Sequence, residues 1–293
     1  MRTVVLVAGV LAMASAFAAD LDTHFRSNSD LVLINATVVD GHDRIVTHLD
    51  RDQFRVLDGR QEMRLTSVAV EETPVSVVVL LDASGSMKRV MSQSVAALDV
   101  LLDSLRPDDE VSLLAIHNGV KTVLPFTQDF GTVREAARLL TASGPTALLD
   151  GIGAGFSMGR HARYPRKALM IFSDGGERDS RFEWREVRSM ARESGMRLFP
   201  FLVWSAADDF QWEQAELRAM AEDTGGRLYA VSRARNLTAE VAKIPLHQQF
   251  VLAFAPDEAE RDGRFRRVKV ELRNTSKDLR VFWKHGYFAP NEE

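Results

Sequence analysis

Carboxylate and hydroxyl side chains occur where apolar runs of the sequence end. Five of them could act together: Asp82, Ser84, Ser86, Thr146 and Asp174. The first three stand on alternate positions of one short turn, in which Gly85 lets the backbone approach a ligand closely. Hard oxygen donors suit Mg²⁺, with Mn²⁺ or Ca²⁺ as alternatives, better than they suit Zn²⁺. The sequence therefore predicts a site for a hard divalent cation.

The elements that must position these donors alternate between short apolar strands and amphipathic helices. Strands are predicted over 75–82, 111–117, 168–174, 198–204 and 227–231, with an antiparallel edge strand over 121–126. Helical apolar faces run through 98–105, 133–140, 184–191, 217–221 and 237–244. This alternation predicts an α/β fold with a doubly wound, mostly parallel sheet flanked by helices. The carboxyl ends of such strands form the ligand crevice, and Asp82 and Asp174 fall there.

Both ends of the chain have the sequence pattern of β-strands instead. Residues 31–71 and 250–288 alternate apolar and polar positions around turn signals such as Asp58-Gly59. Neither flank alone offers enough strands to bury a face. We therefore expect the two flanks to pair into one discontinuous, sandwich-like β unit. The expected boundaries are 20–73 for the N-terminal β-rich flank, 74–245 for the α/β domain and 246–293 for the C-terminal flank.

The first residues have the pattern of a secretory signal. Arg2 precedes an apolar run from Val4 to Ala19 that ends in small residues before Asp20, which predicts a signal peptide over 1–19. A membrane anchor is the alternative reading. The run is shorter than a usual span and rich in alanine, so no stable membrane span is expected after cleavage. We expect the protein to be periplasmic or extracellular.

Composition excludes several classes of function. The chain has 37 Lys and Arg against 41 Asp and Glu, a net charge of −4, so nucleic acid is not an expected partner. It has no cysteine, which removes disulfides, thiolate metal sites and cysteine nucleophiles. Any metal must therefore be held by oxygen or imidazole. Nothing in the sequence predicts an oligomeric state.

The five donors resemble the metal-ion-dependent adhesion site (MIDAS) of the von Willebrand factor type A (VWA) domain, with every position filled. The resemblance covers about 74–244 and implies a Rossmann-like VWA fold. The flanks resemble a secreted bacterial, acidobacterial-type VWA-related family, in segments 52–59, 250–256, 262–266 and 286–290. The glycine-rich stretch 151–155 departs from the family's pattern.

Roles for the donors and for the protein follow from this resemblance. It implies direct ligation by Ser84 and Ser86. Asp82 and Asp174 would act directly or through water, and Thr146 would join or leave the shell with the ligand. Because only two donors are anionic and Asp174 could act through water, the bound ion would keep positive charge for a carboxylate. The expectation is a cation-dependent protein-binding or adhesion module, not an enzyme, completed by an acidic residue of an unidentified protein.

Two alternatives concern the donors themselves and catalysis. Ser and Asp are good helix caps, so the turn at 82–86 could do no more than cap a helix. The segment 155–159 matches the G-x-S-x-G elbow of serine hydrolases, with Asp174 and His247 following in the required order. The apolar spacing before Ser157 instead places that residue late in a helix.

Three further alternatives stay open. A metal-independent scaffold subunit of an envelope assembly would fit the same fold. His42 and His48 could form a zinc site, and the basic stretch 264–269 could be either a surface for anionic polymers or a strand with a solvated face. Trp212 is expected on a loop near the metal face, where it could contact a partner.

Overall fold

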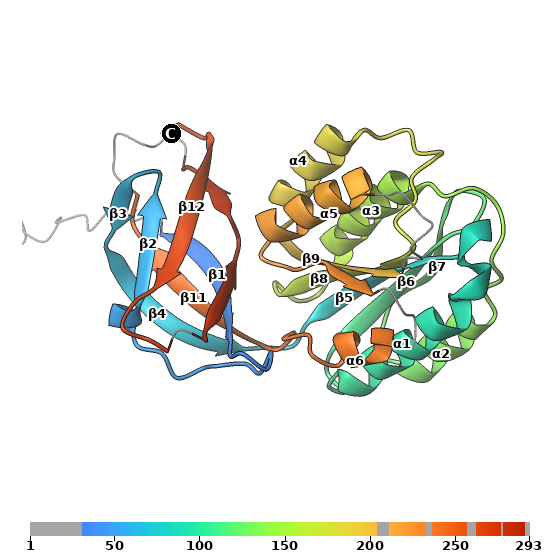
Figure 1. The fold of residues 1–293 in the computed structure, drawn as a ribbon, viewed down its shortest axis with the longest axis horizontal. Helices are drawn as coiled ribbons and strands as arrows, with labels where there is room; N and C mark the ends of the chain where they lie inside the picture. The colour runs from blue at the N-terminus through green and yellow to red at the C-terminus, as the bar shows by residue number, and fades with distance from the viewer. Residues whose placement is uncertain (1–30, 204–210, 232–235, 257–261, 277, 291–293) are drawn as a thin grey trace, which may run out of the picture. The chain divides into compact units, whose positions relative to one another are not determined.

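A six-stranded sheet organises the α/β part of the chain (Figure 1). The computed structural model describes residues 31–203, 211–231, 236–256, 262–276 and 278–290; the predicted signal peptide, 1–19, lies outside them. The sheet order is β10-β9-β8-β5-β6-β7, made of β5 (Ser76–Asp82), β6 (Glu110–Ile116), β7 (Val120–Thr127), β8 (Lys167–Ser173), β9 (Met196–Val203) and β10 (Tyr229–Val231). All neighbours are parallel except β6 and β7. The predicted doubly wound sheet with an antiparallel edge strand is confirmed.

Helices cover both faces of this sheet, because successive residues of each buried strand point to opposite sides. One face carries α1 (Met91–Ser104), α2 (Phe130–Arg138) and α6 (Leu237–Val241). The other carries α3 (Leu148–Met158), α4 (Trp184–Ser194) and α5 (Gln211–Asp223) (Figure 1). Val77 and Val79 of β5 pack toward the first group and Val78 and Leu80 toward the second. Every residue of β5 is buried, so its end is held rigidly.

Gly151 and Gly155, in the glycine-rich stretch 151–155, lie on the face of α3 that packs on the sheet. A Cβ at Gly155 would lie 2.7 Å from the side chain of Leu169, and one at Gly151 would lie 3.0 Å from Ile116 and Leu80. Glycine weakens a helix by about 1 kcal/mol relative to alanine. Here it permits a close approach to the strands, so the departure from the family's pattern corresponds to tight packing of α3.

The two flanks of the chain combine into two four-stranded sheets, ordered β13-β1-β11-β4 and β14-β12-β2-β3. The N-terminal strands are β1 (Val32–Val39), β2 (Phe54–Asp58), β3 (Gln61–Met63) and β4 (Leu65–Glu72), with a short 3-10 helix at Arg51–Gln53. The C-terminal strands are β11 (Gln248–Phe254), β12 (Phe265–Leu272), β13 (Arg280–Trp283) and β14 (Gly286–Phe288). Each sheet mixes strands of both flanks; for example, Phe250 of β11 lies between Ala36 and Val70. The expected pairing of the flanks is confirmed.

Two runs read as continuous β sequence are each divided in the structure. The run around 63–70 breaks at Arg64 into β3 and β4, and the run 279–288 breaks at Lys284 and His285 into β13 and β14. In both cases the halves belong to different sheets. Trp283 and Tyr287 still face the same apolar core. Because alternation continues across each break, periodicity alone could not reveal the change of sheet.

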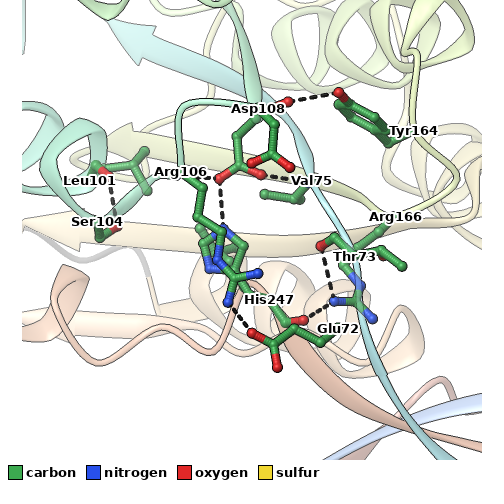
Figure 2. Close-up of polar contacts among 12 residues, drawn as sticks. Glu72, Thr73, Val75, Leu101, Ser104, Arg106, Asp108, Tyr164, Arg166 and His247 are labelled. Carbon is green, nitrogen blue, oxygen red and sulfur yellow. Dashed lines mark hydrogen bonds and ion pairs between the residues drawn. The ribbon is translucent and has the colours of Figure 1, made fainter.

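The two connections between the β unit and the α/β part run next to each other. Glu72, at the end of β4, is paired with Gln248, at the start of β11. Arg166 donates hydrogen bonds to the backbone carbonyls of Thr73 (3.4 Å) and His247, one on each connection (Figure 2). The chain therefore enters and leaves the α/β part at the amino ends of its parallel strands, which we call the junction edge.

Asp109 ties the junction edge together. Its carboxylate accepts hydrogen bonds from the backbone amides of Val75 (2.8 Å) and Arg106 (2.7 Å) and contacts Nε2 of His247 at 2.6 Å. Burial raises the pKa of Asp109, but these hydrogen bonds outweigh it and hold that pKa below its ordinary value. Close by, the buried Arg197 guanidinium donates to two backbone carbonyls of the outgoing connection, at 2.9 and 2.8 Å. The junction edge is therefore densely hydrogen-bonded.

No helix in the described part of the chain is long and apolar enough to span a bilayer.

Candidate metal centre

The candidate donors lie at the carboxyl ends of β5 and β8, which we call the metal edge. From β5 the chain builds β6 and β7 on one side and β8, β9 and β10 on the other, so the strand order reverses between β5 and β8. Asp82 is the last residue of β5, and Asp174 directly follows β8. Ligands of doubly wound sheets bind at such a reversal. The predicted position of the site in the fold therefore agrees with the observed topology.

Asp82 is a fully buried carboxylate without a basic partner. Its Oδ1 accepts a hydrogen bond from the amide of Ser84 (2.9 Å), and its Oδ2 accepts one from the Ser173 hydroxyl (2.7 Å). Burial raises the pKa of Asp82 to about 6, and the nearby carboxylate of Asp174 adds to the rise against these hydrogen bonds. In the described residues no lysine or arginine pairs with either acid. An added cation would relieve this unbalanced charge.

The two serines of the turn point their hydroxyls at each other, not at a helix. Their Oγ atoms are 3.1 Å apart. Ser84 precedes a short 3-10 helix, Gly85–Arg89, but its side chain makes no capping hydrogen bond, and α1 begins only at Met91. Helix capping therefore does not explain these hydroxyls. Ser84 is buried while Ser86 is exposed, so the pair reaches from the strand end to the surface.

Backbone hydrogen bonds hold the segment before Thr146 against the serine turn. The amide of Ser143 donates to the carbonyl of Ala83 (2.8 Å), and the amide of Gly85 donates to the carbonyl of Gly144 (2.9 Å). Gly144 has φ of 82°, a left-handed conformation that favours glycine. Thr146 itself is buried. The structure thus fixes the Thr146 segment beside the turn that carries Ser84 and Ser86.

The loop that follows β8 is fastened to the start of α3. The carbonyl of Thr146 accepts hydrogen bonds from the amides of Arg178 and Asp179, both at 3.1 Å. Glu177 Oε2 accepts one from the amide of Leu149 at 2.8 Å and so caps α3 from outside the helix. The serine turn, the Thr146 segment and the loop after Asp174 form one hydrogen-bonded unit.

The donor set fits a hard divalent cation held largely by hydroxyls. Two carboxylates and three hydroxyls are the oxygen ligands that Mg²⁺ accepts. Across the described ranges no three His, Asp or Glu side chains gather into a metal cluster, so the zinc alternative at His42 and His48 gains no support. Asp82, Ser84, Ser86, Thr146 and Asp174 would hold the ion, which would supply a Lewis-acidic centre for a carboxylate.

Comparison with known proteins identifies the α/β part. Residues 77–177 match the family model of the von Willebrand factor type A domain. This chain carries a VWA domain. VWA domains are generally interaction modules rather than enzymes. No curated protein matches the chain.

Solved structures of low sequence identity are similar to this chain, and one of them has a TM-score above 0.5. The von Willebrand factor type A protein from Catenulispora acidiphila is 13% identical with a TM-score of 0.52, over 92% of this chain and 76% of that one. BatB from Bacteroides thetaiotaomicron is 17% identical (TM-score 0.48; 58% of this chain, 96% of that one). The type V pili tip protein Mfa5 from Porphyromonas gingivalis is 12% identical (TM-score 0.47; 58% and 93%). The fold likeness to the first extends beyond the VWA domain into the β unit.

The hydrolase motif has no elbow in the VWA domain. Ser157 lies near the end of α3 and is exposed, as the apolar spacing predicts. His247 contacts Asp109 at the junction edge, whereas Asp174 lies at the metal edge. The three groups of the supposed triad therefore do not share a site.

Two other sequence expectations have clear outcomes. The basic stretch 264–269 falls mainly in β12, where Val268 is buried and Lys269 is exposed and paired with Glu271 at 2.7 Å, so it is a strand with a solvated face. Trp212 was expected on a loop, and this is wrong, because it lies in the first turn of α5. It is nevertheless 58% exposed.

Sequence reasoning missed Ser173 and Glu177. Ser173 hydrogen-bonds Asp82, and Glu177 caps α3. The signal for Ser173 was present: a hydroxyl directly precedes Asp174 at the end of a strand predicted to adjoin the Asp82 strand. Glu177 had no local signal, because its partner Leu149 lies far away in the sequence.

Proposed function

We propose that the protein is an exported, divalent-cation-dependent protein-binding module of the adhesion type. A Mg²⁺ ion, or Mn²⁺ or Ca²⁺ in its place, would be held by Asp82, Ser84, Ser86, Thr146 and Asp174, as in an intact MIDAS. An acidic side chain of a partner protein would complete the shell. The single observation that carries the proposal is the convergence of paired serine hydroxyls and two acids without basic partners at the strand-order reversal.

Charge around the metal edge favours an acidic partner. Lys88 and Arg89 follow the serine turn directly, are exposed, and form no ion pair in the described structure. Two carboxylates leave the ion with little excess negative charge around it, so a third carboxylate can bind. The chain as a whole carries −4, so an acidic partner would be repelled elsewhere on its surface. A cation at this site resolves that repulsion locally.

Calorimetry with Mg²⁺ tests the site directly. We expect the wild-type protein to bind one ion, and Ser84→Ala plus Ser86→Ala to lose most of the affinity because two direct donors disappear. Ser157→Ala is the matched control, since it removes an exposed serine hydroxyl of the same domain away from the donors. Equal binding by wild type and the double variant would defeat the proposal.

The partner can then be sought by its metal dependence. The wild-type chain, immobilised and exposed to an extract of the source cells, should retain an acidic protein in Mg²⁺ and release it in EDTA. The Ser84→Ala plus Ser86→Ala variant should retain nothing under either condition. Retention that ignores EDTA would instead favour the metal-independent scaffold. The periplasmic or extracellular location is part of the same proposal and is tested by N-terminal sequencing of the exported protein.

A further inference from the structure

An open groove with exposed aromatic side chains adjoins the metal edge. It has a volume of about 500 Å³ and is lined by the loop after β8 together with residues of α3, α4 and α5. Phe182 is 41% exposed and Trp212 is 58% exposed, although both are large and apolar. Trp184 meets Trp212 edge to face, with ring centroids 5.4 Å apart. Exposed aromatics grouped in a hollow mark binding surfaces more often than they mark chance exposure.

The groove shares its structural support with the metal edge. Leu149 lines the groove and is the second residue of α3, three residues after Thr146. Arg178 also lines the groove, and its amide is bonded to the Thr146 carbonyl. A ligand group at Thr146 therefore lies beside the groove entrance. One partner segment can reach both places.

Contacts with α3 position the aromatic side chain of Phe182 in the groove. A Cβ at Gly153 would lie 3.1 Å from the ring of Phe182, so the absent side chain on α3 provides the seat for that ring. The loop that carries Phe182 is fixed by Asp150, whose Oδ1 accepts hydrogen bonds from the amides of Arg181 (2.9 Å) and Phe182 (3.1 Å). The surface is thus preorganised, which lowers the entropic cost of binding.

The acidic side chains that line the groove already have hydrogen-bond partners, whereas its basic side chains are largely available to a ligand. The two acids that line it are occupied by helix amides: Glu177 accepts from Leu149, and Glu183 takes part in the capping box of α4. The two arginines are free or nearly so. Arg178 has no ion pair among the described residues, and Arg185 meets only Glu183 at 3.6 Å while remaining 92% exposed. A negatively charged segment would find both guanidinium groups available.

We propose that this groove binds an aromatic or large apolar side chain of the same partner segment whose carboxylate completes the metal shell. The inference rests on the proposed function and narrows the partner to an acidic segment that also carries an aromatic residue. Phe182, Trp184 and Trp212 receive the ring, and Arg178 and Arg185 receive a second acid. Aromatic anchors of this kind usually dominate the affinity of an interface.

The test uses the full chain and immobilised synthetic peptides of Gly and Ser with one central Glu. Each peptide of the series carries one Trp at a different position before or after the Glu. Matched control peptides lack the Trp or carry Gln in place of the Glu. In Mg²⁺ we expect Glu-Trp peptides at one or two spacings to bind about tenfold more tightly than the Trp-free peptide. Trp212→Ala should reduce the affinity of these Glu-Trp peptides to that of the Trp-free peptide. Leu139→Ala, which truncates an 81% exposed apolar residue at the end of α2, is the control.

The outcomes separate this inference from the proposed function. Mg²⁺-dependent binding without a Trp preference, or with a preference that survives Trp212→Ala, overturns the groove and leaves the metal function standing. Binding that is equal in Mg²⁺ and EDTA for every peptide overturns the metal function, and the groove inference with it. Arg178→Glu is a second variant, at an exposed residue. It should weaken peptides that carry a second Glu by about tenfold, and an unchanged affinity contradicts the role of the arginines.

Discussion

The two edges of the same sheet treat buried charge in opposite ways. At the junction edge Asp109 has three hydrogen-bond partners and a lowered pKa. At the metal edge Asp82 is at least as buried, has no basic partner and has a pKa raised to about 6. The hydrogen-bonded Asp109 carboxylate contributes stability, whereas the buried charge of Asp82 costs stability. The difference agrees with a structural role for the junction edge and with the proposed ligand-binding role of the metal edge.

The largest effect should come from removing the centre of the junction edge. Asp109→Ala leaves the amides of Val75 and Arg106 without acceptors, so the free energy of unfolding should fall by about 4 kcal/mol. Urea denaturation measures this. Asp103→Ala is the control, since its carboxylate is 73% exposed and its ion pair with Arg134 is worth less than about 1 kcal/mol. Similar losses in both variants would mean that Asp109 has no special structural role.

The matching substitution at the metal edge should behave differently. Asp82→Asn removes a buried charge that lacks a partner, so stability in EDTA should equal or exceed that of the wild type. Mg²⁺ at about a hundred times its Kd should stabilise the wild type by about 3 kcal/mol and leave Asp82→Asn unchanged. Thermal unfolding with and without Mg²⁺ measures both. If Asp82→Asn is as damaging in EDTA as Asp109→Ala, the two edges are not distinct.

The two edges should also respond to pH with opposite signs when EDTA is present. Native Asp82, with a pKa of about 6, takes up a proton before the unfolded chain does, so its unfavourable contribution diminishes as pH falls from 7 to 5. The stability of wild type relative to Asp82→Asn should rise by about 1 kcal/mol over that range. Asp109, with a lowered pKa, stabilises the fold above about pH 4, and this contribution is lost as pH falls further.

Asp109→Asn provides the control for the acid side of that comparison. It should show a weaker loss of stability below about pH 4 than the wild type. Some loss will remain, because Asp223 also has a lowered pKa. Burial raises that pKa, but hydrogen bonds from Arg188 and Arg192 outweigh the effect. Urea denaturation across the pH range checks both arms. If the stability of wild type and of Asp82→Asn changed equally between pH 7 and 5, the predicted difference between the two edges would be contradicted.

The smallest effect probes how the metal edge is held on the sheet. Gly155→Ala places a Cβ 2.7 Å from Leu169, which should cost about 1 to 2 kcal/mol and lift α3 slightly. Since Thr146 precedes α3, Mg²⁺ affinity should fall several-fold in calorimetry. Gly41→Ala is the control, because its nearest neighbour would be 3.8 Å away. Lost stability with unchanged Mg²⁺ affinity would show that the position of α3 does not govern the metal edge.

Features encoded locally were predictable from the sequence. The apolar runs ending at Asp82 and Asp174 placed both acids at strand ends, and the pairing rules for parallel strands placed those ends on one edge. Features that depend on distant partners were not predictable. Glu177 caps a helix by accepting from Leu149, 28 residues earlier, and Asp109 looks like an ordinary acidic loop residue until His247 comes within 2.6 Å of it.

Residue types and their alternation did not predict features that depend on how the elements pack. The glycines at 151–155 break the family's pattern, yet they make the tight face of α3. Trp212 was expected on a loop near the metal face, but it lies in α5, which begins earlier than the predicted helical face 217–221. Alternation predicted strands in the flanks but gave no sign of which sheet each one joins.

The paired connections at the junction edge have a mechanical consequence. Because Glu72 and Gln248 are opposite each other, the VWA domain is a side branch of the β unit and not a link in series with it. A pull received at the metal edge divides between two covalent crossings. The force that reaches β11 pulls this strand along β1. The five residue pairs between β11 and β1 would resist that sliding together. Tension along the rest of the chain would not pass through the VWA domain, so under the proposed function the metal edge could hold a ligand while the β unit bore the load.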